Sequence, residues 1–372
     1  MTFGQISGFL SRSTARLLAL VFVLMLLMFT LTGFLAAAYR REKYYRAEQQ
    51  FQAGNRLAAA GRHLAAVHQY TEALTLSRDN PRFKFALALA LLEAGREREA
   101  ETYFLELVRD DPAAATPNLM LARNYARQQN IEAATQYYQR AIYGLWTDNP
   151  LAHRIDARFE LIELLIQERK YLPVQAELLR QLDEIPRDPA LMKRVGRLFL
   201  ASQSYEEARQ VFEELTKISP RDPEAYAGLA DARFELGRYA PARDAYRQAL
   251  RLNPADIQSS TQSALVSEIL GLDPMRPGLR AAQRLALSRQ LLERALVELD
   301  PCAARLPEDL RLAIERARQI VARKLRQTAS AEIIEANIAL AASLYRSGRE
   351  TCGSPPVPDR ALALVLEKLT RE

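Results

Sequence analysis

The first strong pattern along the chain is an uninterrupted apolar run from residue 17 to residue 38. These 22 residues carry no charged side chain, and a helix of this length rises about 33 Å, enough to span a hydrocarbon core of roughly 30 Å. Tyrosines and basic residues follow at 39–46, as is typical of a membrane interface. The run predicts a transmembrane helix at 17–38, after a short N-terminal segment at 1–16. The alternative is a cleaved signal peptide, because residues 36–38 resemble a small-residue cleavage site.

Beyond residue 46 the apolar positions repeat with a period of 34 residues, most regularly from 189 to 256. The units that begin at Pro189 and Pro223 carry small residues and aromatics at matching positions. Each unit is expected to form two short helices in a hairpin, and a proline at position 32 ends the second helix. The matching residues are Gly196, Tyr205, Ala208, Phe212 and Pro220 in the first unit, and Ala230, Tyr239, Ala242, Tyr246 and Pro254 in the second.

This pattern resembles the tetratricopeptide repeat (TPR), whose period and small and aromatic positions it matches. The resemblance implies an all-α fold, in which stacked hairpins form an α-solenoid and bury apolar faces that none could bury alone. The same frame extends upstream, with six extra residues at 149–154, and no linker separates the first repeat from the predicted transmembrane helix. The predicted repeats are 47–80, 81–114, 115–148, 155–188, 189–222 and 223–256.

The C-terminal third departs from the 34-residue pattern. Residues 257–300 are interpreted as a degenerate seventh repeat with a long helix at 279–299, and residues 301–372 as a helical cap of the solenoid. Amphipathic periodicity predicts cap helices at 306–327, 330–346 and 360–369.

The two cysteines, Cys302 and Cys352, flank the predicted helices 306–327 and 330–346. If these helices form an antiparallel hairpin, both thiols lie at the same open end, where a disulfide would close a loop of about 50 residues. The alternative is a pair of unpaired buried thiols. A disulfide indicates an oxidising compartment and so favours the periplasmic side of a bacterial inner membrane for the repeats. The positive residues after the predicted span favour the cytoplasmic side, which is the alternative. We expect the periplasmic side, because the excess of positive charge is small.

In the tetratricopeptide repeat family, positions 5 and 9 of each first helix line the inner surface of the solenoid. In this chain the first three repeats have mostly apolar residues at these positions, and the fifth has two positive charges. This composition suits a partner segment that is apolar or amphipathic and has a negative end. The alternative is that some of these side chains pack against neighbouring helices. The residues are Phe51 and Asn55, Phe85 and Leu89, Leu119 and Arg123, Phe159 and Glu163, Lys193 and Arg197, and Ala227 and Asp231.

Composition and motifs argue against several other functions. The chain has 372 residues, 49% of them hydrophobic and 26% charged, and its net charge of +6 is spread along the sequence, which is weak evidence for nucleic acid binding. The three histidines lack metal-ligand spacing, and no glycine-rich phosphate loop or nucleophile motif is present. We therefore expect no enzyme activity, cofactor, metal or small-molecule substrate.

The sequence therefore predicts a single-pass, membrane-anchored scaffold whose inner groove binds a protein partner, in the assembly or organisation of an envelope or membrane complex. The alternative is a permanent structural subunit of such a complex.

Overall fold

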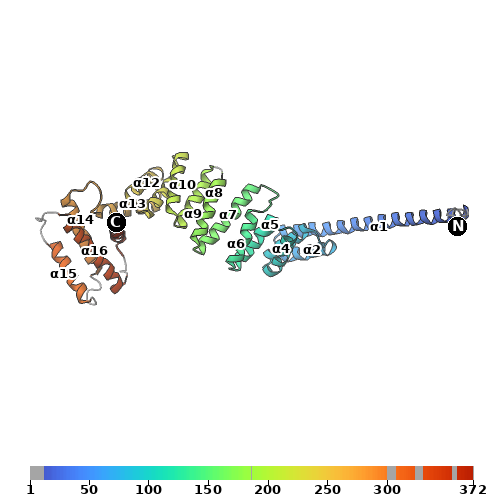
Figure 1. Cartoon of the computed structure of the whole chain (residues 1–372), viewed down its shortest axis with the longest axis horizontal. Helices are drawn as coiled ribbons and strands as arrows, with labels where there is room; N and C mark the ends of the chain where they lie inside the picture. The colour runs from blue at the N-terminus through green and yellow to red at the C-terminus, as the bar shows by residue number, and fades with distance from the viewer. Residues whose placement is uncertain (1–11, 186, 300–306, 323–329, 354–357, 372) are drawn as a thin grey trace, which may run out of the picture. The chain divides into compact units, whose positions relative to one another are not determined.

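The computed structural model describes residues 12–185, 187–299, 307–322, 330–353 and 358–371. Within these ranges the elements are helices and no strand is present, which confirms the predicted all-α fold (Figure 1). The chain divides into two compact units, Met1–Leu164 (unit 1) and Leu165–Glu372 (unit 2), which are described separately. In chain order the first helices are α1 (Arg12–Ala59), α2 (His63–Leu76), α3 (Pro81–Glu93), α4 (Glu97–Asp110), α5 (Ala115–Arg127), α6 (Ile131–Ile142) and α7 (Pro150–Gln167), the last of which ends three residues beyond the unit boundary. Those that follow are α8 (Tyr171–Glu184), α9 (Pro189–Ala201), α10 (Tyr205–Ile218), α11 (Pro223–Glu235), α12 (Tyr239–Leu252), α13 (Ile257–Leu272), α14 (Ala281–Leu299), α15 (Glu308–Ala322), α16 (Ala331–Cys352) and α17 (Arg360–Arg371).

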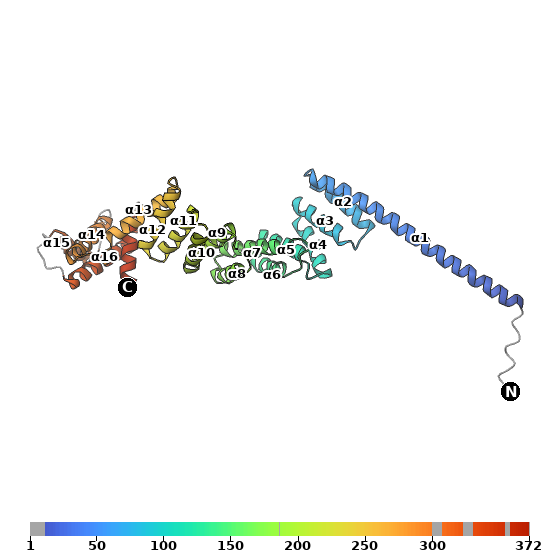
Figure 2. The ribbon, with the colours of Figure 1, turned by 90° about the horizontal axis from the view of Figure 1, so that it is seen from above.

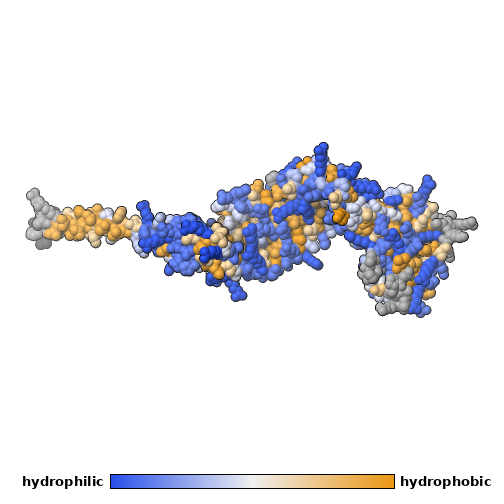
Figure 3. All heavy atoms as spheres, turned by 180° about the vertical axis from the view of Figure 1, so that it is seen from behind, coloured by the Kyte–Doolittle hydropathy of each residue, from blue (hydrophilic) through white to orange (hydrophobic). Residues whose placement is uncertain are grey.

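Helix α1 runs without a break through 48 residues. Its apolar stretch is exposed, with Leu24 61% and Phe29 79% accessible. Figure 3 shows this stretch as an apolar rod, and Figure 2 shows it projecting beyond α2, the helix against which α1 packs. From Leu17 onward, where burial is described, the first buried residue of α1 is Ala47. One helix therefore contains both the predicted membrane span and the first helix of the first predicted repeat.

The core of unit 1 is built from the helix pairs α1/α2, α3/α4 and α5/α6. Aromatic rings fill the space between the pairs: Phe51 stacks on Phe83 with ring centroids 4.8 Å apart, and Phe104 is fully buried. Glycine allows one of these rings to come close, because a Cβ on Gly54 would lie 2.6 Å from the ring of Tyr70. Unit 1 thus has the alternation of small and aromatic residues on which the predicted repeats depend.

The six extra residues at 149–154 lengthen a helix. Helix α7 begins at Pro150 and has 18 residues, whereas α3 and α5 have 13 each. Proline suits this first turn because its missing N–H would have no partner within the helix. Just before α7, the ring of Trp146 stacks on His153 with centroids 5.0 Å apart. The insertion therefore extends the first helix of the fourth predicted repeat by more than a turn.

In unit 2 the helix starts recur with the same spacing as the apolar positions. Asp188, Asp222 and Asp256 are 34 residues apart, and each accepts a hydrogen bond from a backbone N–H in the first turn of α9, α11 or α13. Pro189 and Pro223 follow two of these caps at the first helical position. These local signals fix where the helices begin.

The ring of Phe212 is held between two helices of unit 2 and is only 1% exposed. A Cβ on Gly228 of α11 would lie 2.3 Å from this ring, and one on Gly196 of α9 would lie 2.7 Å away. Glycine is unfavourable inside a helix. Its presence at these two positions is explained by the ring, which leaves no room for a larger side chain.

The helices of the C-terminal part differ in length from the prediction. Helix α14 begins two residues later than expected, and α16 continues six residues beyond the predicted end at Arg346. Gly348 does not end α16, because this glycine packs against Leu299 of α14, where a Cβ would lie 2.3 Å from a side-chain carbon. The helix ends instead before Gly353, which has a left-handed φ of 75°.

The predicted disulfide falls partly outside the described residues. Cys352 is the last residue of α16 and is disulfide-bonded. Cys302 lies outside the described residues, so its pairing with Cys352 stays a prediction. Helix α16 packs against α14 as well as against α15, so the cap is more than the simple hairpin expected from the sequence.

Candidate partner-binding surface

The apolar groove positions predicted in unit 1 lie mainly in its core. Phe51 is 5% exposed and Leu119 6%, and Phe159 is fully buried. Phe85 and Leu89 are half-buried against the same core. These five side chains therefore follow the alternative in which groove positions pack against neighbouring helices, and little of this apolar surface is available to a partner.

The polar groove positions of unit 1 are bonded within the protein. Asn55 accepts a hydrogen bond of 2.8 Å from the hydroxyl of Tyr70. Arg123 donates two hydrogen bonds, of 2.8 and 2.6 Å, to the carboxylate of Glu160, which also accepts a bond from Tyr138. Burial raises the pKa of Tyr138, so this phenol stays a donor at neutral pH. Glu163 is exposed.

The two positive charges predicted in the fifth repeat are paired within unit 2. Lys193 Nζ lies 3.0 Å from Asp222 and 3.6 Å from Glu224, and Arg197 lies 2.5 Å from Glu224. The hydrogen bond to Asp222 raises the pKa of Lys193. These acids begin the next repeat, and they face α9 because α9 packs against α11. The expectation of a partner with a negative end therefore loses its basis, since neighbouring acids already neutralise both cations.

A cavity of about 480 Å³ opens in unit 2 between residues of α9, α11 and the start of α13. Its lining includes the two predicted groove positions of the sixth repeat, Ala227 and Asp231, and Phe212. Apolar and polar groups share the lining, which suits an extended peptide better than a compact cofactor. The lining residues are Arg197, Leu200, Phe212, Glu224, Ala227, Gly228, Asp231, Asp256, Gln258 and Ser259.

Asp231 is a carboxylate in this cavity that is bonded to a buried tyrosine. Its carboxylate accepts a hydrogen bond of 2.5 Å from the hydroxyl of Tyr246. Burial raises the pKa of Asp231, because the charged form loses contact with water. Asp231 is at a predicted inner-surface position of the sixth repeat, but the sequence indicates no particular role for it. The signal that could have found it is the spacing of 15 residues to Tyr246, which matches that from Asn55 to Tyr70.

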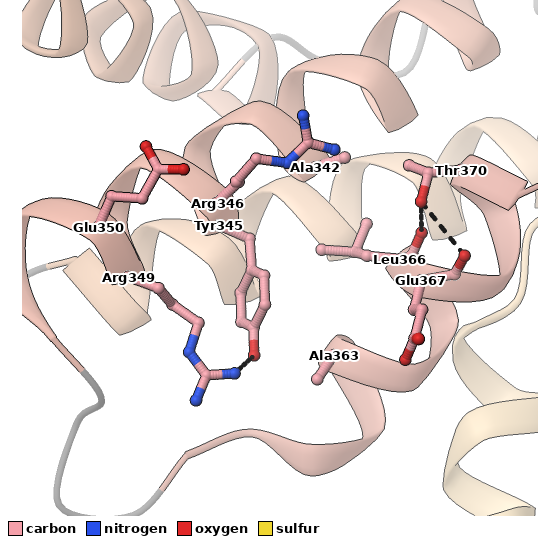
Figure 4. Close-up of a pocket in the computed structure, with 9 residues that line it drawn as sticks. All are labelled: Ala342, Tyr345, Arg346, Arg349, Glu350, Ala363, Leu366, Glu367 and Thr370. Atoms are coloured by element: carbon pink, nitrogen blue, oxygen red, sulfur yellow. Dashed lines mark hydrogen bonds between the residues drawn. The ribbon is translucent and has the colours of Figure 1, made fainter.

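A second groove lies between α16 and α17, outside the predicted repeats, with a volume of about 470 Å³ (Figure 4). Arg349 donates a hydrogen bond of 2.8 Å to the hydroxyl of Tyr345, and Arg346, Glu350 and Glu367 lie around them. Because both signs of charge line this groove, it indicates no single class of ligand. Among the described residues, no group of three or more potential metal ligands is found.

Comparison with known proteins gives matches to one family. A sequence model described as tetratricopeptide repeat matches residues 57–116 and 199–261, and a second model of the same description matches residues 98–150. A curated relative, TPR repeat-containing thioredoxin TTL4 of Arabidopsis thaliana, is 31% identical over 123 residues, covering 33% of this chain and 18% of the relative. Superkiller protein 3 of Schizosaccharomyces pombe is 26% identical over 196 residues, covering 49% of this chain and 14% of the relative. The chain thus spans less than a fifth of the length of either relative.

Similar solved structures are also tetratricopeptide repeat proteins. One is YrrB, described as a TPR protein with an unusual peptide-binding site, with 15% identity and a TM-score of 0.41 over 52% of this chain and 97% of that one. Another, from Parabacteroides merdae, has 15% identity and a TM-score of 0.40 over 88% of this chain and 100% of that one. The residues matched by the family models fall in both units and coincide with helix pairs at 34-residue spacing. The chain is therefore a protein with tetratricopeptide repeats in both of its compact units.

Proposed function

We propose that this protein is a membrane-anchored scaffold that binds a segment of a partner protein at the inner face of its repeats. Tetratricopeptide repeat proteins mediate protein–protein interactions and are generally not enzymes. The observation that supports the anchor is the exposure of the apolar stretch of α1 in a helix that continues into the first repeat. An uncovered apolar surface of this size is unfavourable in water and is stable in a bilayer.

The residues that directly follow the apolar stretch are of the kinds that lie at a membrane interface. Tyr39, Tyr44 and Tyr45 are all more than half exposed, and basic residues lie between them. From residue 38 to Ala47, the first buried residue, a helix rises roughly 14 Å. The first repeat therefore begins close to the headgroups, which is where a scaffold for a membrane complex would hold its partner.

Two features of the sequence bear on the side of the membrane, and they point in opposite directions. A disulfide between Cys302 and Cys352 would place the repeats on the oxidising, periplasmic side of a bacterial inner membrane. The positive charges after the stretch support the cytoplasmic side. We propose the periplasmic side, since the excess of positive charge is small and Glu42 and Glu48 partly offset it.

The partner site is tested with the full chain in lipid nanodiscs and a short-peptide display library. Ala227→Trp fills the cavity between α9, α11 and α13, and Arg247→Trp places the same ring at an exposed position of α12 as the matched control. We expect selected peptides to bind the unmodified chain and the Arg247 variant but not the Ala227 variant. Equal binding by both variants would exclude this cavity as the partner site. Failure to select any peptide would favour a permanent subunit that buries a folded neighbour.

A further inference from the structure

We propose that the cavity between α9, α11 and α13 receives a lysine or arginine side chain of the partner segment, which pairs with Asp231. This inference rests on the proposed function and specifies the chemistry of the partner. It also reverses the charge expected from the sequence, because the cations at Lys193 and Arg197 are already paired.

Three carboxylates line the cavity among the described residues, and they differ in their partners. Glu224 forms ion pairs with both Arg197 and Lys193. Asp256 caps α13 and accepts hydrogen bonds from the backbone N–H and the hydroxyl of Ser259. Asp231 accepts only the Tyr246 hydroxyl and forms no ion pair within the described residues. It is therefore the carboxylate with which a cation from outside the chain would form an ion pair.

A comparison within the chain shows that the fold does not need a charge at this position. Asn55 occupies the same position of the first repeat and accepts the same bond from Tyr70, at 2.8 Å. An asparagine thus satisfies the tyrosine hydroxyl as an aspartate does. Burial opposes ionisation of Asp231, so its charge makes the fold less stable than a neutral acceptor would. A charge that the fold does not need is explained by recognition of a partner.

A segment of the chain itself brings a cation close to α11. Helix α17 packs against α13, although its Lys368 pairs with Asp273 at the C-terminal end of α13, away from the cavity at the start of that helix. The guanidinium of Arg360 lies 6.0 Å from the ring centroid of Phe234. Phe234 is three residues from Asp231 on α11, so both lie on the same side of that helix. A cationic side chain of a partner segment would likewise lie beside α11, in the open cavity.

The shape of the cavity sets the neighbours of that cation. Leu200 and Ala227 supply apolar contacts, and Gly228 adds no side chain to the lining beside the Phe212 ring. A segment that presents one cation flanked by apolar residues fits this lining better than a polybasic segment, because Arg197 also borders the cavity.

The test compares Asp231→Asn with the unmodified full chain in nanodiscs, using the same display library. The variant keeps an acceptor for Tyr246, and its fold is checked by thermal unfolding. Asn55→Asp, in unit 1, is the control that adds a carboxylate to a tyrosine-bonded position elsewhere. We expect peptides selected on the unmodified chain to share one lysine or arginine, and to bind Asp231→Asn at least about tenfold more weakly, as is typical of a lost charged hydrogen bond. The Asn55 variant should bind them unchanged.

Three outcomes would overturn the inference. Selected peptides that lack a common cation, or that bind Asp231→Asn as tightly as the unmodified chain, would exclude the pairing while leaving the cavity as a peptide site. A library that yields no peptide dependent on this cavity would remove both the pairing and the proposed partner site.

Discussion

Gly228→Ala should destabilise unit 2, because the new methyl group has no room. Its Cβ would lie 2.3 Å from the ring of Phe212, more than 1 Å inside ordinary contact, and Gly196 confines the same ring from the other helix. Overpacking of a well-packed core costs about 1–3 kcal/mol, and alanine returns about 0.5–1 kcal/mol through its better helix propensity. Since the ring is confined on both sides, we expect a net loss of about 2 kcal/mol.

Calorimetric unfolding of the full chain in nanodiscs measures this effect. A loss of about 2 kcal/mol should lower the melting temperature by roughly 4–8 °C in a unit of this size. Gly271→Ala is the matched control, because no atom lies within 4 Å of its added Cβ, and it should leave the melting temperature unchanged or slightly higher. Adding Phe212→Leu to the Gly228 variant should recover part of the loss. A Gly228 variant that melts with the unmodified chain would refute this account of the packing.

Three further predictions concern charges and thiols. Asp231→Asn should raise the free energy of unfolding at pH 7, because burial raises the pKa of Asp231 and the ionised acid carries the cost of a buried charge. The difference in stability between the variant and the unmodified chain should shrink as the pH falls, since the protonated acid no longer carries this cost. A difference that calorimetry finds independent of pH would contradict this. Lys368→Met should destabilise unit 2 by about 2–4 kcal/mol, since Asp273 is only 2% exposed and would lose its cation. Urea unfolding at neutral pH measures this loss, and an unchanged unfolding midpoint would show that the ion pair does not stabilise unit 2. Mass mapping without reductant should find Cys302 joined to Cys352, whereas free thiols on both would remove the argument for an oxidising compartment.

The repeat frame could be predicted from the sequence because its signals are local. The aspartate caps and prolines that begin α9 and α11 are visible as letters at a fixed spacing. The length of α16 could not be predicted in this way. Glycine often follows the end of a helix, but Gly348 lies inside α16 and packs against Leu299 of α14. No local sequence pattern reveals this contact.

The candidate site was harder to predict than the fold. The sequence predicts that Phe51 lines the groove, but it is buried because it stacks on Phe83 of the next predicted repeat. The pairing of Lys193 likewise depends on Asp222, 29 residues further along the chain. Position numbers transferred from a family therefore do not show which side chains remain available, because contacts with neighbouring repeats decide their burial and pairing.

The membrane anchor is the claim on which the proposed function depends most. Alkaline carbonate extraction of native membranes, followed by the intact mass of the extracted and pelleted protein, tests it most directly. We expect a protein that still contains residues 17–38 in the pellet. A chain in the supernatant that begins at or near Tyr39 would show that residues 17–38 are a removed signal peptide, and would contradict the account of a repeat protein held at the membrane by α1.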